Sequence, residues 1–137
     1  MTDFFLHFHS GWRYVVIVVT VLVALFFVYA LITQRTSEKQ EKNTLRIWAG
    51  VMDLQLLPGI LLLVNYLLDD KYYDKLVGHF STAIIAVLIA HVPAFYRRLN
   101  GDPPALVRRL MGAALPVIVI VLVIVAVSAI DRPLFGS

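Results

Sequence analysis

Two histidines occupy comparable positions at the start of two apolar stretches of the chain. His9 precedes the first stretch by a few residues, and His79 lies near the start of the third. If both stretches cross a bilayer in the same direction, the two imidazoles lie at a similar depth. Helices one and three of an up-down four-helix bundle commonly face each other across its core. Two such histidines could supply both axial nitrogens of a b-type haem.

The neighbours of these histidines fit that chemistry but also have ordinary structural explanations. Arg13 lies one helical turn after His9, on the same face, where it could pair with a haem propionate. Trp12 is typical of the aromatic belt of a membrane protein, where a lone histidine can equally be an interfacial anchor. His7 would point about 200° away from His9 on a helix and is therefore the less suitable ligand. Small residues follow on the His79 face and suit a macrocycle or another helix: Thr82, Ala83, Ala86 and Ala90.

A second layer of polar residues is expected nearer the inner side of the membrane. Asp53 lies six residues into the second apolar stretch, and His91 lies five residues before the end of the third. The two side chains could pair, with Gln55 close by, because a carboxylate inside a membrane is costly and normally has a partner. Such a group could carry protons near a quinone headgroup, or it could simply join two helices.

The elements that must position these residues are long apolar runs. The chain has 137 residues, of which 60% are hydrophobic and only 15% charged. Its mean hydropathy is +0.82. Runs of about 20 residues, enough to span a hydrocarbon core, occupy 14–33, 47–68, 76–96 and 110–130. Asp53 is the one charged residue within them.

These runs predict an all-α integral membrane protein, a single transmembrane domain covering 1–137. Many of their residues are β-branched, but an open strand cannot satisfy its backbone in lipid, so helices are favoured. The first run is longer than the apolar part of a signal peptide, and no small-residue cleavage site follows it, so we expect a retained helix.

The basic residues predict the orientation of the bundle. Eight of the twelve lie in the connections 34–46 and 97–109, and four lie on the other side. The excess places both connections inside and both termini on the outer, periplasmic side. The formal net charge of +3 follows from this distribution and gives no indication of nucleic-acid binding.

Several kinds of chemistry are excluded by composition. The absence of cysteine removes disulfides, iron–sulfur clusters and covalently attached c-type haem. The chain contains no glycine-rich phosphate loop, nucleophile elbow or zinc-protease histidine pair. Its connections are too short for a soluble catalytic domain, so any chemistry must occur within or at the edges of the helices.

Three short motifs resemble a family of small bacterial four-helix membrane proteins that are often described as cytochrome b-like or uncharacterised. The motifs are FLHFHSGWRYV at 5–15, LQLLPGI at 54–60 and GHF at 78–80. The resemblance implies a multi-pass protein of the bacterial inner membrane, and it singles out His9, Arg13, Gln55 and His79. Gly78 and Asp53 depart from the family pattern, which has an acid and a histidine near these places.

We therefore expect a membrane protein that binds one b haem between His9 and His79 and passes electrons between a quinone and a partner at the outer face. The alternative is a haem-free accessory subunit of a larger respiratory or photosynthetic complex. Small residues suited to helix contacts favour partners of this kind, either other membrane subunits or further copies of the chain. A proton or small-solute carrier that uses Asp53 and His91 is a third reading.

Overall fold

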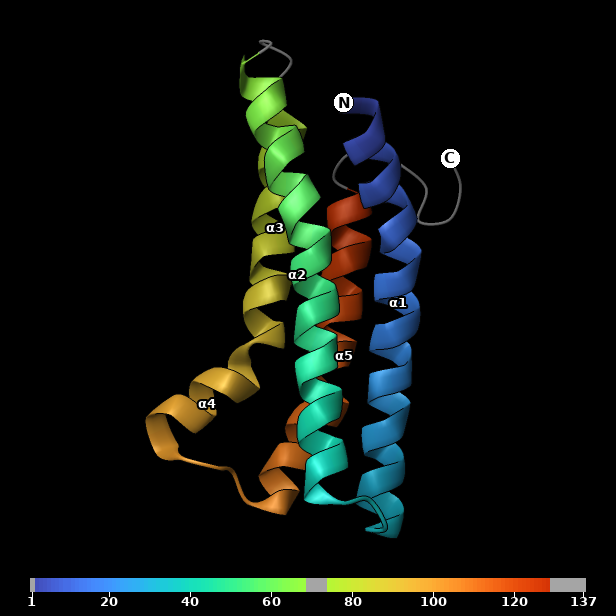
Figure 1. Ribbon diagram of the computed structural model, residues 1–137, viewed down its shortest axis with the longest axis vertical. Coiled ribbons are helices and arrows are strands. Elements are labelled where there is room, and N and C mark those ends of the chain that lie inside the picture. The colour runs from blue at the N-terminus through green and yellow to red at the C-terminus, as the bar shows by residue number, and fades with distance from the viewer. Residues whose placement is uncertain (1, 69–73, 129–137) are drawn as a thin grey trace.

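Every element of the described part of the chain is a helix. The computed structural model describes residues 2–68 and 74–128, in which five helices follow one another (Figure 1). The helices are α1 (Thr2–Thr33), α2 (Glu38–Leu68), α3 (Asp74–Ala90), α4 (Val92–Asn100) and α5 (Ala105–Ser128). The prediction of an all-α protein is confirmed.

The turn between α1 and α2 is defined by local hydrogen bonds. Gln34 adopts a positive φ of 56° just after α1, and its amide donates to the carbonyl of Ala30 at 2.9 Å. A single residue in the left-handed conformation commonly ends an α-helix in this way. Ser37 then caps α2: the Gln40 amide donates to Ser37 Oγ at 3.1 Å, and the Ser37 amide donates to Gln40 Oε1 at 3.0 Å. Reciprocal bonds of this kind form a capping box, which starts α2 well before its apolar part.

The third predicted helix is not continuous. It is interrupted at His91, and the segments Gly78–Ala90 and Val92–Asn100 meet at an angle of 46°. Pro93 lies in the first turn of α4, where its missing N–H and its ring prevent α3 from continuing. The prediction of one helix over 76–96 is therefore wrong, and α4 leaves the axis of α3 (Figure 1).

The ends of the other predicted helices also differ from those observed. The runs 14–33 and 47–68 cover only part of α1 and α2, whose first turns extend back to Thr2 and Glu38. The run 110–130 begins five residues late, because α5 starts at Ala105. Residues 129 and 130 lie outside the described part of the chain.

The helices pack so that α1 and α3 lie at opposite corners. Helix α1 contacts α2 and α5 extensively, and α3 contacts α5 and, less extensively, α2. The α1–α2 and α4–α5 connections lie at one end of the molecule, and the first residues of α1 lie at the other (Figure 1). The core is formed by apolar side chains from these long helices: Val16, Val23, Phe27, Trp48, Met52, Ala86, Ala90 and Val119.

The outer surface of the helices is apolar. Leu22, Leu25, Leu57 and Val121 are among many large hydrophobic side chains that are more than half exposed. A water-soluble helix would bury this surface. In the described part of the chain, three helices are long and apolar enough to cross a membrane, and α3 with α4 makes a fourth if the bent pair is one span.

Candidate functional site

The structure brings His9 of α1 and His79 of α3 together. Their ring centres are 6.3 Å apart, and the ring planes are inclined at 80°. His9 lies within α1, not before it as the apolar run indicated, because α1 begins at Thr2. His79 lies in the second turn of α3, which begins at Asp74. The two diagonal helices thus present their imidazoles to the same space.

A backbone carbonyl of α2 determines that the Nδ1 atom of the His9 ring carries a hydrogen. His9 Nδ1 lies 3.1 Å from the carbonyl oxygen of Gln55. A carbonyl can only accept, so Nδ1 carries the hydrogen, and a neutral His9 ring has its lone pair on Nε2. Metal-ligating histidines commonly use one ring nitrogen in this way, which orients the ring and makes the other nitrogen more basic.

Gly59 allows the His9 ring to lie directly against α2. A Cβ added at Gly59 would be 3.0 Å from His9 Cε1. Pro58 lies next to Gly59 within α2, where the lack of an N–H weakens the local helix hydrogen bonding. The LQLLPGI motif at 54–60 therefore positions His9 in two ways: Gln55 supplies the carbonyl that accepts from Nδ1, and Gly59 lets the ring approach α2 closely.

The residues after His9 fasten α1 to α2. Trp12 Nε1 donates to the carbonyl of Val51 at 3.0 Å. Trp12 also stacks on Phe8, with ring centres 5.7 Å apart and planes inclined at 7°. Arg13 Nη2 donates to the Tyr14 hydroxyl at 3.1 Å, and the guanidinium lies 4.9 Å from the centre of the Tyr14 ring. Tyr14 is therefore one observed partner of Arg13.

The second polar layer contains two of its three predicted residues. His91 Nε2 lies 2.9 Å from Asp53 Oδ1, at the break between α3 and α4. The Asp53 side chain is 52% exposed. Gln55 does not join this pair: its carbonyl accepts from His9, and two residues of α-helix turn it about 200° from Asp53. Its side-chain oxygen Oε1 is buried without a hydrogen-bond partner.

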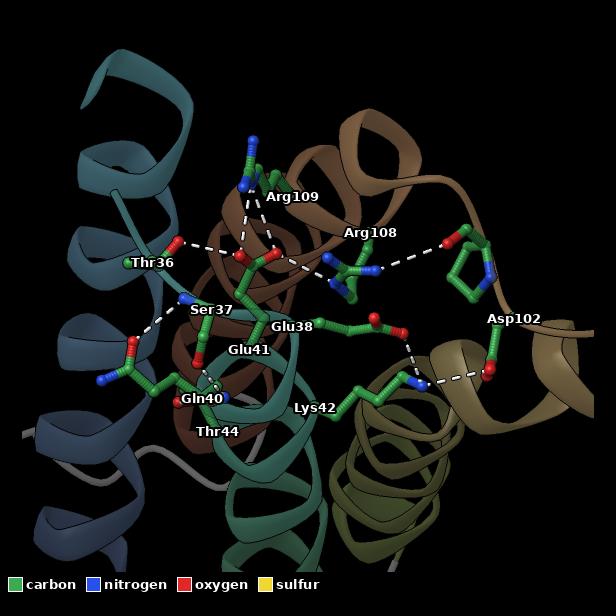
Figure 2. Close-up of polar contacts among 11 residues, drawn as sticks. Thr36, Ser37, Glu38, Gln40, Glu41, Lys42, Thr44, Asp102, Arg108 and Arg109 are labelled. Atoms are coloured by element: carbon green, nitrogen blue, oxygen red, sulfur yellow. Dashed lines mark hydrogen bonds and ion pairs between the residues drawn. The ribbon is translucent and has the colours of Figure 1, made fainter. Parts of the chain in front are cut away.

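A cluster that the sequence analysis missed surrounds Glu41, whose side chain is completely buried (Figure 2). Arg108 Nε donates to Glu41 Oε1 at 2.9 Å, Arg109 Nε lies 3.3 Å from both carboxylate oxygens, and Thr36 Oγ1 donates to Oε2 at 2.8 Å. Arg108 also donates to the Pro103 carbonyl at 3.4 Å. This cluster joins the start of α2 to the start of α5.

The sequence does contain a signal for this cluster. Glu41 is an acid within one of two basic connections that the orientation rule places on the same side of the membrane. Opposite charges at the same level were the available clue. The basic residues of these connections indicate orientation, but they can also pair with an acid such as Glu41.

The described residues contain no group of three or more histidine, cysteine, aspartate or glutamate side chains that could bind a metal ion. A bare transition-metal ion normally needs three or four protein ligands. A haem iron needs at most two, because the porphyrin supplies the other four. A pair of histidines such as His9 and His79 therefore suits haem iron better than a free metal ion.

Comparisons with known proteins give no match: no family model, no curated protein and no solved structure is significantly similar to the chain. The resemblance to the small bacterial four-helix family stays a prediction from three short motifs.

Proposed function

We propose that the protein is a membrane-embedded electron-transfer protein that binds one b-type haem between His9 and His79. The observation that supports this most is the Nδ1–H bond from His9 to the Gln55 carbonyl, which directs the lone pair of a neutral ring to Nε2. The neighbouring imidazole of His79 would provide the second axial nitrogen.

The separation of the two rings suits this role. A metal–imidazole bond is about 2 Å long, so one iron held by both His9 and His79 would require the two rings to lie close together. The measured separation of the ring centres is 6.3 Å.

Each neighbouring residue has a defined task in this proposal. Haem supplies one-electron redox chemistry, with a quinone as the expected second reactant and a partner at the outer face. Gln55 and Gly59 orient the His9 imidazole. Arg13, one turn from His9, would exchange its Tyr14 hydroxyl for a propionate, to which a guanidinium binds more strongly.

We further propose that α1, α2, α3 with its bent continuation α4, and α5 form a four-helix bundle in the bacterial inner membrane. Both termini would face the outer side. The excess of basic residues in the α1–α2 and α4–α5 connections supports this orientation. The haem site would then lie near the outer surface, within reach of a partner there.

The test is a visible spectrum of the detergent-purified protein from haem-replete cells, oxidised and dithionite-reduced. Wild type should show a Soret band, and His79→Ala and His9→Ala should lose it. His7→Ala is the matched control, because His7 lies in the same helix with an exposed side chain and should leave the band unchanged. Gly59→Ala should weaken haem binding by displacing the His9 ring. A colourless wild-type preparation would refute the proposal.

A haem-free accessory subunit is the second candidate, and the exposure of Asp53 favours it. A carboxylate that is half exposed on an apolar helix is unfavourable in lipid, so a neighbouring subunit would cover it and its partner His91. In this case a larger complex should co-purify, and Asp53→Asn should change its yield. A stable monomer with its own Soret band would exclude this candidate.

A further inference from the structure

A cavity of about 300 Å³ extends along α2 from Asp53 toward the α4–α5 connection. Its walls come from the first half of α2, the break between α3 and α4, and the connection that leads to α5. Four basic side chains and two acidic ones line it: Lys42, Arg46, Arg97, Arg108, Asp53 and Asp102.

Two of the basic groups are neutralised by neighbours. Lys42 Nζ lies 2.8 Å from Glu38 Oε1 and 3.1 Å from Asp102 Oδ2 (Figure 2). Arg108 is paired with the buried Glu41 at 2.9 Å. Of the two acids in the cavity wall, Asp102 pairs with Lys42 and Asp53 contacts His91, which offsets its charge only when the imidazole is protonated.

Arg46 and Arg97 are the remaining basic residues of the cavity wall. Neither forms an ion pair with any residue that the structure describes. One comes from α2 and the other from α4, so they border the cavity from different helices. Between them the wall is formed by small or apolar residues: Leu45, Ala49, Gly50, Ala90, Pro93 and Ala94. The cavity therefore combines two arginines that form no ion pair within the described residues with an apolar surface.

Helix α4 indicates where this cavity lies relative to the bilayer. None of its nine residues is buried. Phe95 and Leu99, one turn apart, are 46% and 81% exposed, and Arg97 and Arg98 lie between them. A short helix with an exposed apolar stripe and a basic face is typical of the membrane interface. Anionic headgroups are found at this level.

We propose that the cavity binds the headgroup of an anionic phospholipid, with its phosphate between Arg46 and Arg97 and its glycerol and upper acyl carbons along Ala49 and Ala94. A guanidinium suits phosphate because its planar donors bind two oxygens at once. The apolar wall favours a lipid over a free phosphate ion. This proposal does not depend on haem.

The test is native mass spectrometry of the full-length protein in a neutral detergent, titrated with phosphatidylglycerol and, separately, with phosphatidylcholine. Wild type should retain phosphatidylglycerol preferentially. An Arg46→Gln/Arg97→Gln variant should bind it about 30-fold more weakly, since the loss of one direct hydrogen bond to the phosphate at each arginine lowers the affinity about fivefold. The lysine double variant at the same positions should keep most of the affinity.

The matched control is Arg35→Gln/Arg98→Gln, which removes two exposed positive charges that do not line the cavity. It should bind phosphatidylglycerol within about threefold of wild type. An equal loss in both glutamine variants would overturn the proposal, because general charge attraction would then explain the binding. Retained binding in Arg46→Gln/Arg97→Gln would overturn it as well. So would displacement of the lipid by equimolar inorganic phosphate or by a short-chain quinone.

Discussion

Replacing Glu41 by glutamine tests the buried cluster at the start of α2. The substitution keeps the side-chain volume but removes the charge that neutralises Arg108, whose side chain is only 6% exposed. It also replaces one acceptor oxygen with an NH₂ group, next to donors from Thr36 and Arg109. We therefore expect a large loss of stability.

The magnitude follows from the burial of each partner. Removing one member of a buried ion pair costs about 3–5 kcal/mol, mostly because the other charge stays buried. Arg109, with 15% of its side chain exposed, can turn to water, and Arg108 keeps the Pro103 carbonyl. The lower end, about 3 kcal/mol, is therefore expected, which is roughly a 150-fold shift of the unfolding equilibrium.

The assay is unfolding by SDS in mixed micelles, followed by helical circular dichroism. Glu38→Gln is the control, because Glu38 is an exposed acid in the same turn that pairs with Lys42, and exposed pairs contribute little. The double variant Glu41→Gln/Arg108→Gln should lose less than the sum of its single variants. If Glu41→Gln unfolds at the same SDS fraction as Glu38→Gln, the cluster does not stabilise the fold.

Three further substitutions probe the helix contacts by the same unfolding assay. Gly112→Ala places a methyl group against the buried ring of Phe27 and should destabilise the protein by about 1–3 kcal/mol; an unchanged transition would show that α1 and α5 can separate freely. Gly50→Ala, with nothing within 4 Å of the new Cβ, should instead stabilise α2 by about 0.5–1 kcal/mol, and a loss would contradict the open space seen there. Trp48→Phe removes the Nε1–H bond to Thr20 Oγ1 at 3.1 Å and should destabilise the protein by about 1–3 kcal/mol. An unchanged unfolding transition would contradict a structural role for this bond.

The apolar parts of the long helices were predictable because lipid imposes one requirement on every spanning segment. About 20 predominantly apolar residues with few or no charges are needed; the run 14–33 has no charge, and the run 47–68 has only Asp53. The first residues of the helices were less predictable, because hydrogen bonds at the helix ends, and not hydropathy, determine where a helix begins. The Ser37–Gln40 capping box is visible in the sequence, but hydropathy alone does not detect it. Pro93 marks a break only if the helix has no neighbour to accommodate it.

The candidate site was predictable in its depth but not in its hydrogen bonds. His9 and His79 were placed at one level by counting residues, and Asp53 was matched to His91 in the same way. The assignment of Gln55 to the wrong layer shows the limit of counting, because depth along a helix does not say which face a side chain occupies. Backbone partners, such as the carbonyl that accepts from His9, have no residue-type signal at all.

The contact between Glu41 and Arg108 joins residues that are 67 positions apart in the chain. At about 5–20 residues per second, a ribosome adds Arg108 some 3 to 13 s after Glu41. During this interval the α1–α2 hairpin carries a carboxylate without its arginines, and the acid must remain in water at the membrane surface. The hairpin can therefore reach its final position only after the start of α5 has been synthesised.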